Sequence, residues 1–221
     1  MVIRTTKAVI FDMDGTLIDN YSYHIEAWYV ICKKYNAPKS KKHIIAHLHG
    51  TNHEVCKKFF GSEISAEQSA KIGLEKEALY RELYAPHIRP IDGLTELLVL
   101  LQKKDIPMAV GTMGNKENAD FTLNKLDIRH YFKTVLTAED VTHGKPDPEI
   151  FLSCLHALPL SSTLLKDEIW IFEDTSSGIE AATRAGGKAI GILSSKSKSA
   201  LKNVGAAICI KNYHEIVKLI T

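Results

Sequence analysis

The stretch Ala8-Val9-Ile10-Phe11-Asp12-Met13-Asp14-Gly15-Thr16 decides the fold of this 221-residue chain. Its first four residues are apolar, as in a short buried strand, and two carboxylates follow where that strand should end. Asp12 and Asp14 are two residues apart, so they point the same way on an extended chain. Their repulsion is tolerable only if a cation or a transferring group sits between them. Asp12 is therefore a candidate nucleophile, and magnesium and phosphate would both suit the site.

Short apolar runs alternate with longer helical patterns over most of the chain, which predicts a parallel sheet with helices on both faces. The fold class is α/β, with a Rossmann-like sheet. The predicted strands are Lys7 to Asp12, Met108 to Thr112, Thr134 to Thr137, Glu168 to Glu173, Ala189 to Ile192 and Ala206 to Ile210. The predicted crossover helices are Gly93 to Lys104, Lys116 to Leu126, Asp147 to His156 and Ser177 to Ala185.

Residues 20–89 break this alternation because they contain no convincing strand. We expect an inserted α-helical cap domain over 20–89 and an α/β core domain formed by 1–19 and 90–221. Inserts of this length near the active end of a sheet are usually lids or binding elements. The helices predicted in the insert are Ser22 to Lys34, Lys41 to Leu48, Asn52 to Phe60 and Ala66 to Tyr84.

Net charge, cysteine spacing and the length of apolar stretches limit the classes of binding partner and the cellular location that we expect for this chain. The formal net charge is +2 with interspersed charges, which gives no footprint for nucleic acid or an anionic membrane. The four cysteines have no paired spacing and no apolar segment precedes the first strand, so we expect a cytoplasmic protein. The richest apolar stretch is far shorter than the ~20 residues that cross a bilayer. No heptad repeat argues for assembly, so we expect a monomer.

Polar residues follow several predicted strands, and ligands of open α/β sheets bind outside the carboxyl ends of the strands. Asp12, Thr112, Lys145 and Asp174 should therefore meet. Thr112 could hold phosphate oxygens, Lys145 could neutralise a phosphoryl group, and the Glu173-Asp174 pair completes a hard-cation site. Each has a structural alternative: a strand-end Asp is often a helix N-cap, and a Lys before Pro is often a solvated loop residue. Four such signals at strand ends favour the functional interpretation.

Taken together and in this order, the motifs resemble the four signature motifs of the haloacid dehalogenase superfamily over nearly the whole chain. The matching segments are Asp12 to Asp19, Thr112, Gly144-Lys145-Pro146-Asp147-Pro148 and Glu173 to Ala182. The helical insert, with Tyr23-His24-Ile25-Glu26-Ala27-Trp28, resembles the β-phosphoglucomutase-like phosphatase branch.

This resemblance implies that Asp12 attacks phosphorus and forms an aspartyl phosphate, while Asp14 protonates the leaving oxygen and later deprotonates the acceptor. The side chains of Asp12 and Asp174 and the backbone carbonyl of Asp14 would hold Mg²⁺, with Glu173 bonding its water shell. Thr112 and Lys145 would hold the transferring oxygens. The resemblance also implies a cis peptide bond between Lys145 and Pro146.

Two enzyme activities remain open, a phosphatase of small phosphorylated metabolites such as sugar phosphates and a β-phosphoglucomutase-like mutase. A mutase must hold a distal phosphate with strong cations. Where the mutases carry Lys and Arg, this chain has His49-Gly50-Thr51-Asn52-His53, and where they place Ser-Lys-Asn it has Met113-Gly114-Asn115-Lys116. These departures favour a phosphatase. A catalytically silent binding module is a third possibility, although no motif residue is missing.

Several residues are candidate substrate contacts. His24 lies where the mutases keep a histidine beside the catalytic pair, or it simply lines the hinge of the cap. His49 and His53 flank Gly50, where a loop facing the cleft is expected, and Gly114, Asn115 and Lys116 follow Thr112. The spacing of His43, His47, His49 and His53 can also bind zinc, but a solvated face beside nearby lysines is the favoured interpretation.

Overall fold

The computed structural model describes residues 6–48, 51–160 and 168–220. The chain divides into two compact units, Met1–Asp19 with Arg89–Thr221 and, separately, Asn20–Ile88. The first unit is α/β and the second is helical, and each is described by itself below. The predicted fold class, a parallel sheet covered by helices with a helical insert, is confirmed.

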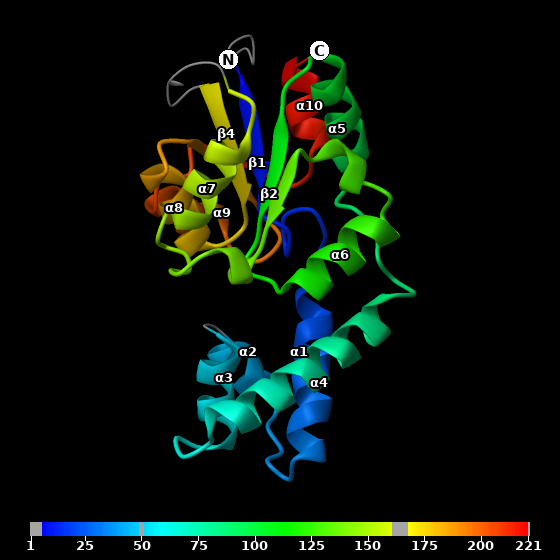
Figure 1. The fold of residues 1–221 in the computed structure, drawn as a ribbon, viewed down its shortest axis with the longest axis vertical. Coiled ribbons are helices and arrows are strands. Elements are labelled where there is room, and N and C mark those ends of the chain that lie inside the picture. The colour runs from blue at the N-terminus through cyan, green and yellow to red at the C-terminus, as the bar shows by residue number, and fades with distance from the viewer. Residues whose placement is uncertain (1–5, 49–50, 161–167, 221) are drawn as a thin grey trace. The chain divides into compact units, whose positions relative to one another are not determined.

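The α/β unit is built on a six-stranded sheet in the order β3-β2-β1-β4-β5-β6 (Figure 1). All its strand pairs are parallel, and β1 lies between β2 and β4. From β1 the chain adds β2 and β3 on one side of the sheet and then β4, β5 and β6 on the other. The point at which the strand order reverses therefore lies beside β1, and ligands of such sheets bind at this point. The strands are β1 Ala8–Phe11, β2 Met108–Gly111, β3 Thr134–Leu136, β4 Ile169–Glu173, β5 Lys188–Ile192 and β6 Ile208–Ile210.

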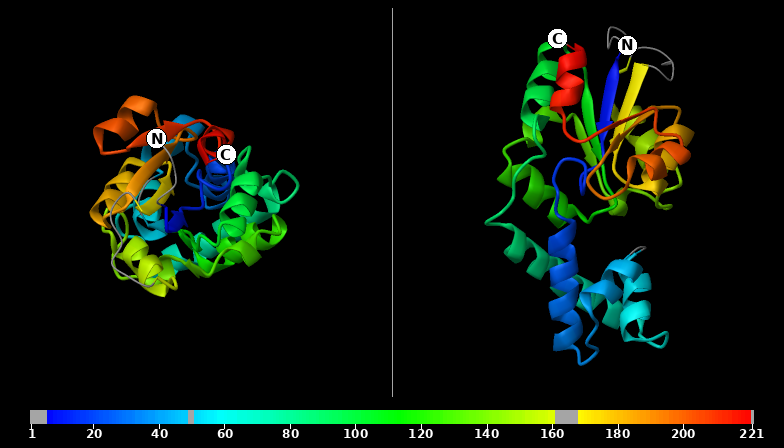
Figure 2. Two further views of the ribbon diagram at one scale, coloured as in Figure 1. Left: turned by 90° about the horizontal axis from the view of Figure 1, so that it is seen from above. Right: turned by 180° about the vertical axis from the view of Figure 1, so that it is seen from behind.

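Helices cover both faces of this sheet, as seen from the front and from behind (Figures 1 and 2). On one face lie α5 Leu94–Lys103, α6 Lys116–Lys125 and α10 His214–Ile220. On the other lie α7 Glu149–Ala157, α8 Ser176–Arg184 and α9 Lys198–Asn203. The 3₁₀ turns η1 Arg129–Tyr131 and η2 Ala138–Asp140 flank β3.

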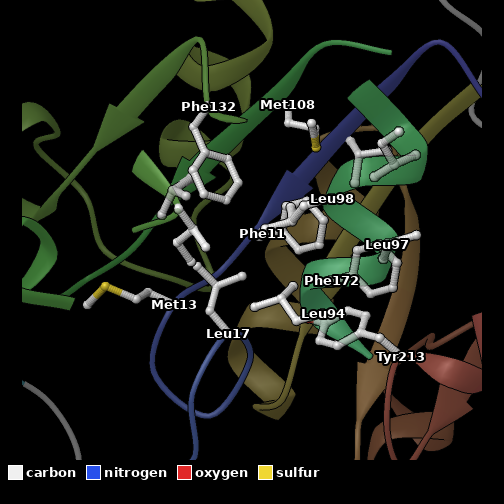
Figure 3. Packing of buried hydrophobic residues seen from close by; sticks show 14 of the residues in the cluster. Phe11, Met13, Leu17, Leu94, Leu97, Leu98, Met108, Phe132, Phe172 and Tyr213 are labelled. Atoms are coloured by element: carbon white, nitrogen blue, oxygen red, sulfur yellow. The ribbon is translucent and has the colours of Figure 1, made fainter. Parts of the chain in front are cut away.

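Alternating side chains of the strands build two separate cores. Phe11 points to the face covered by α5, where its ring stacks on Phe172 at 5.0 Å between centroids and meets the edge of Phe132 at 5.9 Å. Leucines of α5 and Tyr213 close around this cluster (Figure 3). The opposite face is lined by smaller side chains such as Ala8 and Ala109, which let α7 and α8 pack closely.

The predicted strands and helices are all found, with ends displaced by at most two residues. Two helices, α9 and α10, were not predicted. The first has only six residues and a single fully buried side chain, Leu201, so its apolar periodicity is weak. Its start does carry a signal, because the Ser197 side chain accepts a hydrogen bond from the backbone N–H of Ala200, as N-caps do.

The second unit consists of four helices, α1 Tyr21–Lys34, α2 Lys41–His47, α3 Asn52–Phe60 and α4 Ala66–Tyr84. Thr51 and Ser65 begin α3 and α4 with reciprocal capping boxes. The unit has its own core, in which Trp28 of α1 meets the ring of Phe59 edge-on at 5.4 Å between centroids. Among the residues described in either unit, no helix is long and apolar enough to cross a membrane.

Removing the central ring of the larger core should destabilise the protein strongly. Phe11→Ala deletes a fully buried side chain that packs against the rings of three other residues, Phe132, Phe172 and Tyr213, and such substitutions cost about 3–5 kcal/mol. Urea unfolding at pH 7 measures the loss. Leu152→Ala, at a side chain that is 37% exposed, is the control and should cost under about 1 kcal/mol. Equal losses in the two variants would contradict this account of the core.

Candidate active site

Asp12 and Lys145 form a buried ion pair directly beyond the end of β1. The Lys145 Nζ donates to Asp12 Oδ1 at 2.6 Å, to Glu173 Oε1 at 2.8 Å and to the backbone oxygen of Gly111 at 3.2 Å. Between the two aspartates of the motif, Met13 is fully buried in the hydrophobic core. That anchoring turns Asp12 away from the core and toward Lys145.

Glu173 is the last residue of β4, the strand next to β1, and Asp174 follows it directly. Because Phe11 and Phe172 are paired in register, the carboxylates that follow each strand come together. Glu173 Oε2 accepts hydrogen bonds from the backbone N–H of Thr175 at 2.7 Å and from its hydroxyl at 2.9 Å. Gly178 leaves the space that Glu173 needs, since a Cβ there would lie 1.8 Å from Glu173 Cδ.

Burial and mutual repulsion perturb these groups. Burial raises the pKa of Asp12 to about 7, although Lys145 beside it acts in the opposite direction. Burial and the carboxylates of Glu173 and Asp12 raise the pKa of Asp174 well above its ordinary value. Burial alone would lower the pKa of Lys145, but its two carboxylate partners raise it, so Lys145 is protonated at neutral pH. One ammonium group does not compensate three carboxylates.

These carboxylates suit a hard divalent cation. Oxygens of Asp12, Glu173 and Asp174 all lie within 4.8 Å of one another. The Oδ1 atom of Asp174 is buried and has no hydrogen-bond partner among the described residues, and a buried unsatisfied carboxylate oxygen is costly. A cation at this point would satisfy that oxygen and favour the ionised form of each carboxyl group. The donor set, all oxygen, matches magnesium.

Asp14 and Thr112 both lie beside Gly114. A Cβ placed on Gly114 would lie 3.3 Å from Asp14 Oδ2 and 3.4 Å from Thr112 Oγ1. The backbone N–H of Gly114 donates to Thr112 Oγ1 at 3.0 Å. Asp14 is partly exposed, whereas Asp12 is buried. The two aspartates therefore have different surroundings, which is the condition for two different roles in acid–base chemistry.

Asn115 and Lys116 are engaged in local structure. Asn115 is the N-cap of α6 and accepts a hydrogen bond from the backbone N–H of Asn118 at 3.0 Å. Lys116 lies in the first turn of α6, with a side chain that is 69% exposed and 3.6 Å from Asp120 Oδ2. These contacts give both residues a structural role that the sequence pattern did not indicate. Their contact with substrate remains a prediction.

The candidate substrate residues of the helical unit that the structure describes, His24 and His53, have different hydrogen-bond partners. His24 belongs to a buried polar network: its Nδ1 is 2.7 Å from Lys76 Nζ, its ring stacks on Tyr80 at 3.9 Å, and Lys76 Nζ also donates to Glu77 Oε1 at 2.9 Å. Burial and the charge of Lys76 lower the pKa of His24 to about 3, so its ring is neutral. His53 Nδ1 is 2.9 Å from Ser69 Oγ.

The remaining histidine predictions have different outcomes. His49 and Gly50 lie outside the described residues. In α2, the rings of His43 and His47 stack at 4.2 Å. Neither belongs to a group of three metal-ligating side chains in the part of the chain that the structure describes, and the zinc alternative finds no support there.

Two serines beyond β5 support the site and were missed by sequence reasoning. Ser194 Oγ donates to the backbone oxygen of Gly15 at 2.5 Å and lies 3.4 Å from Asp174 Oδ2. Ser195 Oγ donates to the backbone oxygen of Asp174 at 2.9 Å. The signal that could have found them is their position, because residues after any strand of a parallel sheet reach the same edge. The Lys145–Pro146 peptide bond is cis, as predicted.

Fold and site together define an α/β protein with a cluster of buried carboxylates that could hold a cation, and a buried lysine beside them, at the switch point of its sheet. A family model described as haloacid dehalogenase-like hydrolase matches residues 9–217. The chain belongs to this family, as its motifs indicated.

Similar proteins agree with this assignment. A phosphorylated carbohydrates phosphatase of Thermotoga maritima is 30% identical in sequence, and the alignment covers 93% of this chain and 94% of the length of that protein. The β-phosphoglucomutase of Bacillus subtilis is 30% identical over 84% of this chain and 83% of its own. A crystal structure of a family IA, variant 3 hydrolase from Entamoeba histolytica superposes with a TM-score of 0.87 at 30% identity, covering 97% of this chain and 98% of that one.

The position of the Glu173 carboxylate requires that residue 178 have no side chain, and this requirement can be tested. Gly178→Ala would place a methyl group on the carboxylate of Glu173, and overpacking of this kind costs about 1–3 kcal/mol. Urea unfolding measures the loss. Gly73→Ala, where the nearest atom to the added methyl is Asn52 Nδ2 at 3.2 Å, is the control and should change stability by under about 1 kcal/mol. A Gly178→Ala protein as stable as the control would refute the requirement.

Proposed function

We propose that this chain is a magnesium-dependent phosphatase of small phosphorylated metabolites, sugar phosphates in particular, and that it works through an aspartyl phosphate on Asp12. The observation that carries the proposal is the buried contact of Lys145 with Asp12 and Glu173, next to a third carboxylate on Asp174. Haloacid dehalogenase-like family membership and the similarity to a phosphatase of phosphorylated carbohydrates support the same reaction.

In the first step, a carboxylate oxygen of Asp12 attacks the phosphorus and the bond from phosphorus to the sugar oxygen breaks. Asp14 gives its proton to the departing oxygen, so the sugar leaves as an alcohol. Lys145 compensates negative charge on the phosphoryl oxygens, and Thr112 donates a hydrogen bond to one of them. The intermediate is a phosphate group bonded to Asp12.

In the second step, water attacks the phosphorus of this intermediate, Asp14 accepts a proton from the water, and the bond from phosphorus to Asp12 breaks. Inorganic phosphate leaves and Asp12 is regenerated. Magnesium would be held by Asp12, Asp174 and the backbone carbonyl of Asp14, with Glu173 bonding its water, and would offset charge on the phosphoryl oxygens. The same residues thus serve both steps.

We assign the choice of substrate to the helical unit. Its buried cation, Lys76, contacts the carboxylate of Glu77, and the neighbouring His24 ring is neutral. A distal phosphate would compete with Glu77 for this lysine, and a neutral imidazole offers a phosphate no charge. These surroundings favour a monophosphate substrate with polar hydroxyl groups over a bisphosphate.

Asp12→Asn tests the nucleophile. Release of phosphate from p-nitrophenyl phosphate in magnesium buffer should fall about a thousandfold or more, because loss of a nucleophile has this scale. Asp127→Asn, at a fully exposed side chain, is the matched control and should keep wild-type activity. Chelation should abolish the wild-type rate, and added magnesium should restore it. Equal activity in Asp12→Asn and wild type would remove the aspartyl-phosphate mechanism, and an inactive wild type would favour a silent binding module.

The second candidate is a sugar phosphomutase, which the 30% identity to the Bacillus subtilis enzyme favours. Incubation of β-glucose 1-phosphate with a trace of the corresponding bisphosphate separates the two activities. We expect free phosphate to accumulate faster than glucose 6-phosphate, because Lys76, a buried lysine of the helical unit, is already paired with the carboxylate of Glu77. Glucose 6-phosphate forming faster than free phosphate would make the chain a mutase. Coupled enzymatic detection of both products, with Asp12→Asn as the blank, measures the ratio.

A further inference from the structure

Lys145 is carried by a largely exposed loop, in which the Asp147 backbone N–H donates to the Gly144 oxygen at 3.1 Å and Arg184 Nη1 donates to the Pro146 oxygen at 3.3 Å. The loop lies between η2 and α7, and its residues 142–144 and 146 are exposed to solvent. The side-chain tip of Lys145 is held by Asp12 and Glu173. A lysine has a long flexible stem with many rotamers, so contacts at its tip do not by themselves fix the backbone from which it starts. The position of Lys145 therefore also depends on contacts that hold the loop residues before it.

Glu149 holds these loop residues from the start of α7. Its Oε1 accepts the backbone N–H of Thr142 at 2.9 Å, and its Oε2 accepts the backbone N–H of His143 at 2.7 Å. Hydrogen bonds to an ionised carboxylate are shorter and stronger than neutral ones. These two N–H groups lower the pKa of the Glu149 carboxyl group, which is therefore ionised at neutral pH. One carboxylate thus binds two consecutive loop residues.

The helix that bears Glu149 is itself rigidly anchored. The next two residues, Ile150 and Phe151, are fully buried in the sheet core. The ring of Phe151 lies 4.7 Å from Lys145 Nζ. Because Glu149 is in the first turn of α7, its negative charge is also favoured by the helix dipole. Its contacts thus connect the sheet core to the loop just before Lys145.

His143, Asp147 and Glu149 are also close enough together to suggest a cation site. Both carboxylate oxygens of Glu149 already accept backbone hydrogen bonds, and Asp147 Oδ1 accepts the backbone N–H of Glu149 at 3.0 Å. These bonds account for the cluster without an ion. Its carboxylates serve the shape of the loop.

We propose that Glu149 is the positioning residue for Lys145: by holding the N–H groups of Thr142 and His143 it sets the loop so that the Lys145 ammonium reaches Asp12 and Glu173. The proposal rests on the proposed function, in which Lys145 compensates charge on the transferring phosphoryl group. Misplacement of a catalytic group by about 1 Å can cost on the order of a hundredfold in rate. Glu149 touches no reacting atom and acts only through Lys145.

Steady-state kinetics with p-nitrophenyl phosphate and magnesium test this role. Glu149→Ala should lower kcat by about tenfold to a hundredfold and leave KM within about threefold, since the loss falls on the transition state. Glu149→Gln should lie between this variant and wild type, because its amide oxygen still accepts one N–H. Glu215→Ala is the matched control: Glu215 Oε1 likewise accepts a backbone N–H, that of Lys211 at 2.8 Å, away from Lys145. It should keep kcat within about twofold.

A readout independent of activity separates this role from the proposed function. Amide hydrogen exchange of Thr142 and His143, followed by NMR, should accelerate in Glu149→Ala and not in Glu215→Ala, and a crystal structure of Glu149→Ala should show Lys145 Nζ displaced from Asp12. Wild-type kcat or unchanged exchange in Glu149→Ala overturns the proposal. A wild-type chain without phosphatase activity refutes the proposed function instead, and the exchange rates and the Lys145 position then decide the role of Glu149.

Discussion

The contact of one buried ammonium group with two buried carboxylates is the interaction on which the rest of this structure depends. Lys145 meets Asp12 and Glu173 where all three side chains are nearly inaccessible to solvent, each under 10% exposed. Desolvating such charges is expensive, and leaving one of them unpaired is more so. Asp174 adds a further buried carboxylate with an unsatisfied oxygen. The α/β unit must therefore hold a group of charges that would be more stable apart and in water.

The packed sheet holds these buried charged side chains close together. Stacked rings of Phe11 and Phe172 fix β1 against β4 immediately before their carboxylates. Around the charges, small residues and hydroxyl groups complete the arrangement: Gly15 and Gly178 leave room for carboxylates, and Ser194 and Thr175 donate hydrogen bonds. A packed interior on one side of the strand end and hydrogen bonds on the other keep the acidic side chains in place.

In the helical unit, the buried ammonium group of Lys76 is paired with the carboxylate of Glu77. Lys76 contacts Glu77 and His24 in a network that also includes Tyr80 and Asn20. Here a positive charge meets a negative one and a neutral ring, so the charges are matched within the protein. The cluster around Lys145 has one ammonium group for three carboxylates and so suits a cation, whereas the Lys76–Glu77 pair has one charge of each sign. This difference is the reason for the proposal that the α/β unit carries out the chemistry and that the helical unit recognises polar, weakly charged groups.

Local patterns in the sequence determined the strands, most helices and the motif residues, because apolar periodicity and strand-end carboxylates are properties of short segments. They pointed to Asp12, Asp14, Lys145 and Asp174, since parallel strands bring their carboxyl ends to one edge. Only the tertiary structure decided which groups support them. The bond from Ser194 to Gly15 joins residues 179 positions apart, and the pairing of Lys76 with His24 joins residues 52 apart. The place of Ser194 after a strand indicates the edge of the sheet that it reaches, but the partner of each side chain depends on how distant segments pack, which no local pattern encodes.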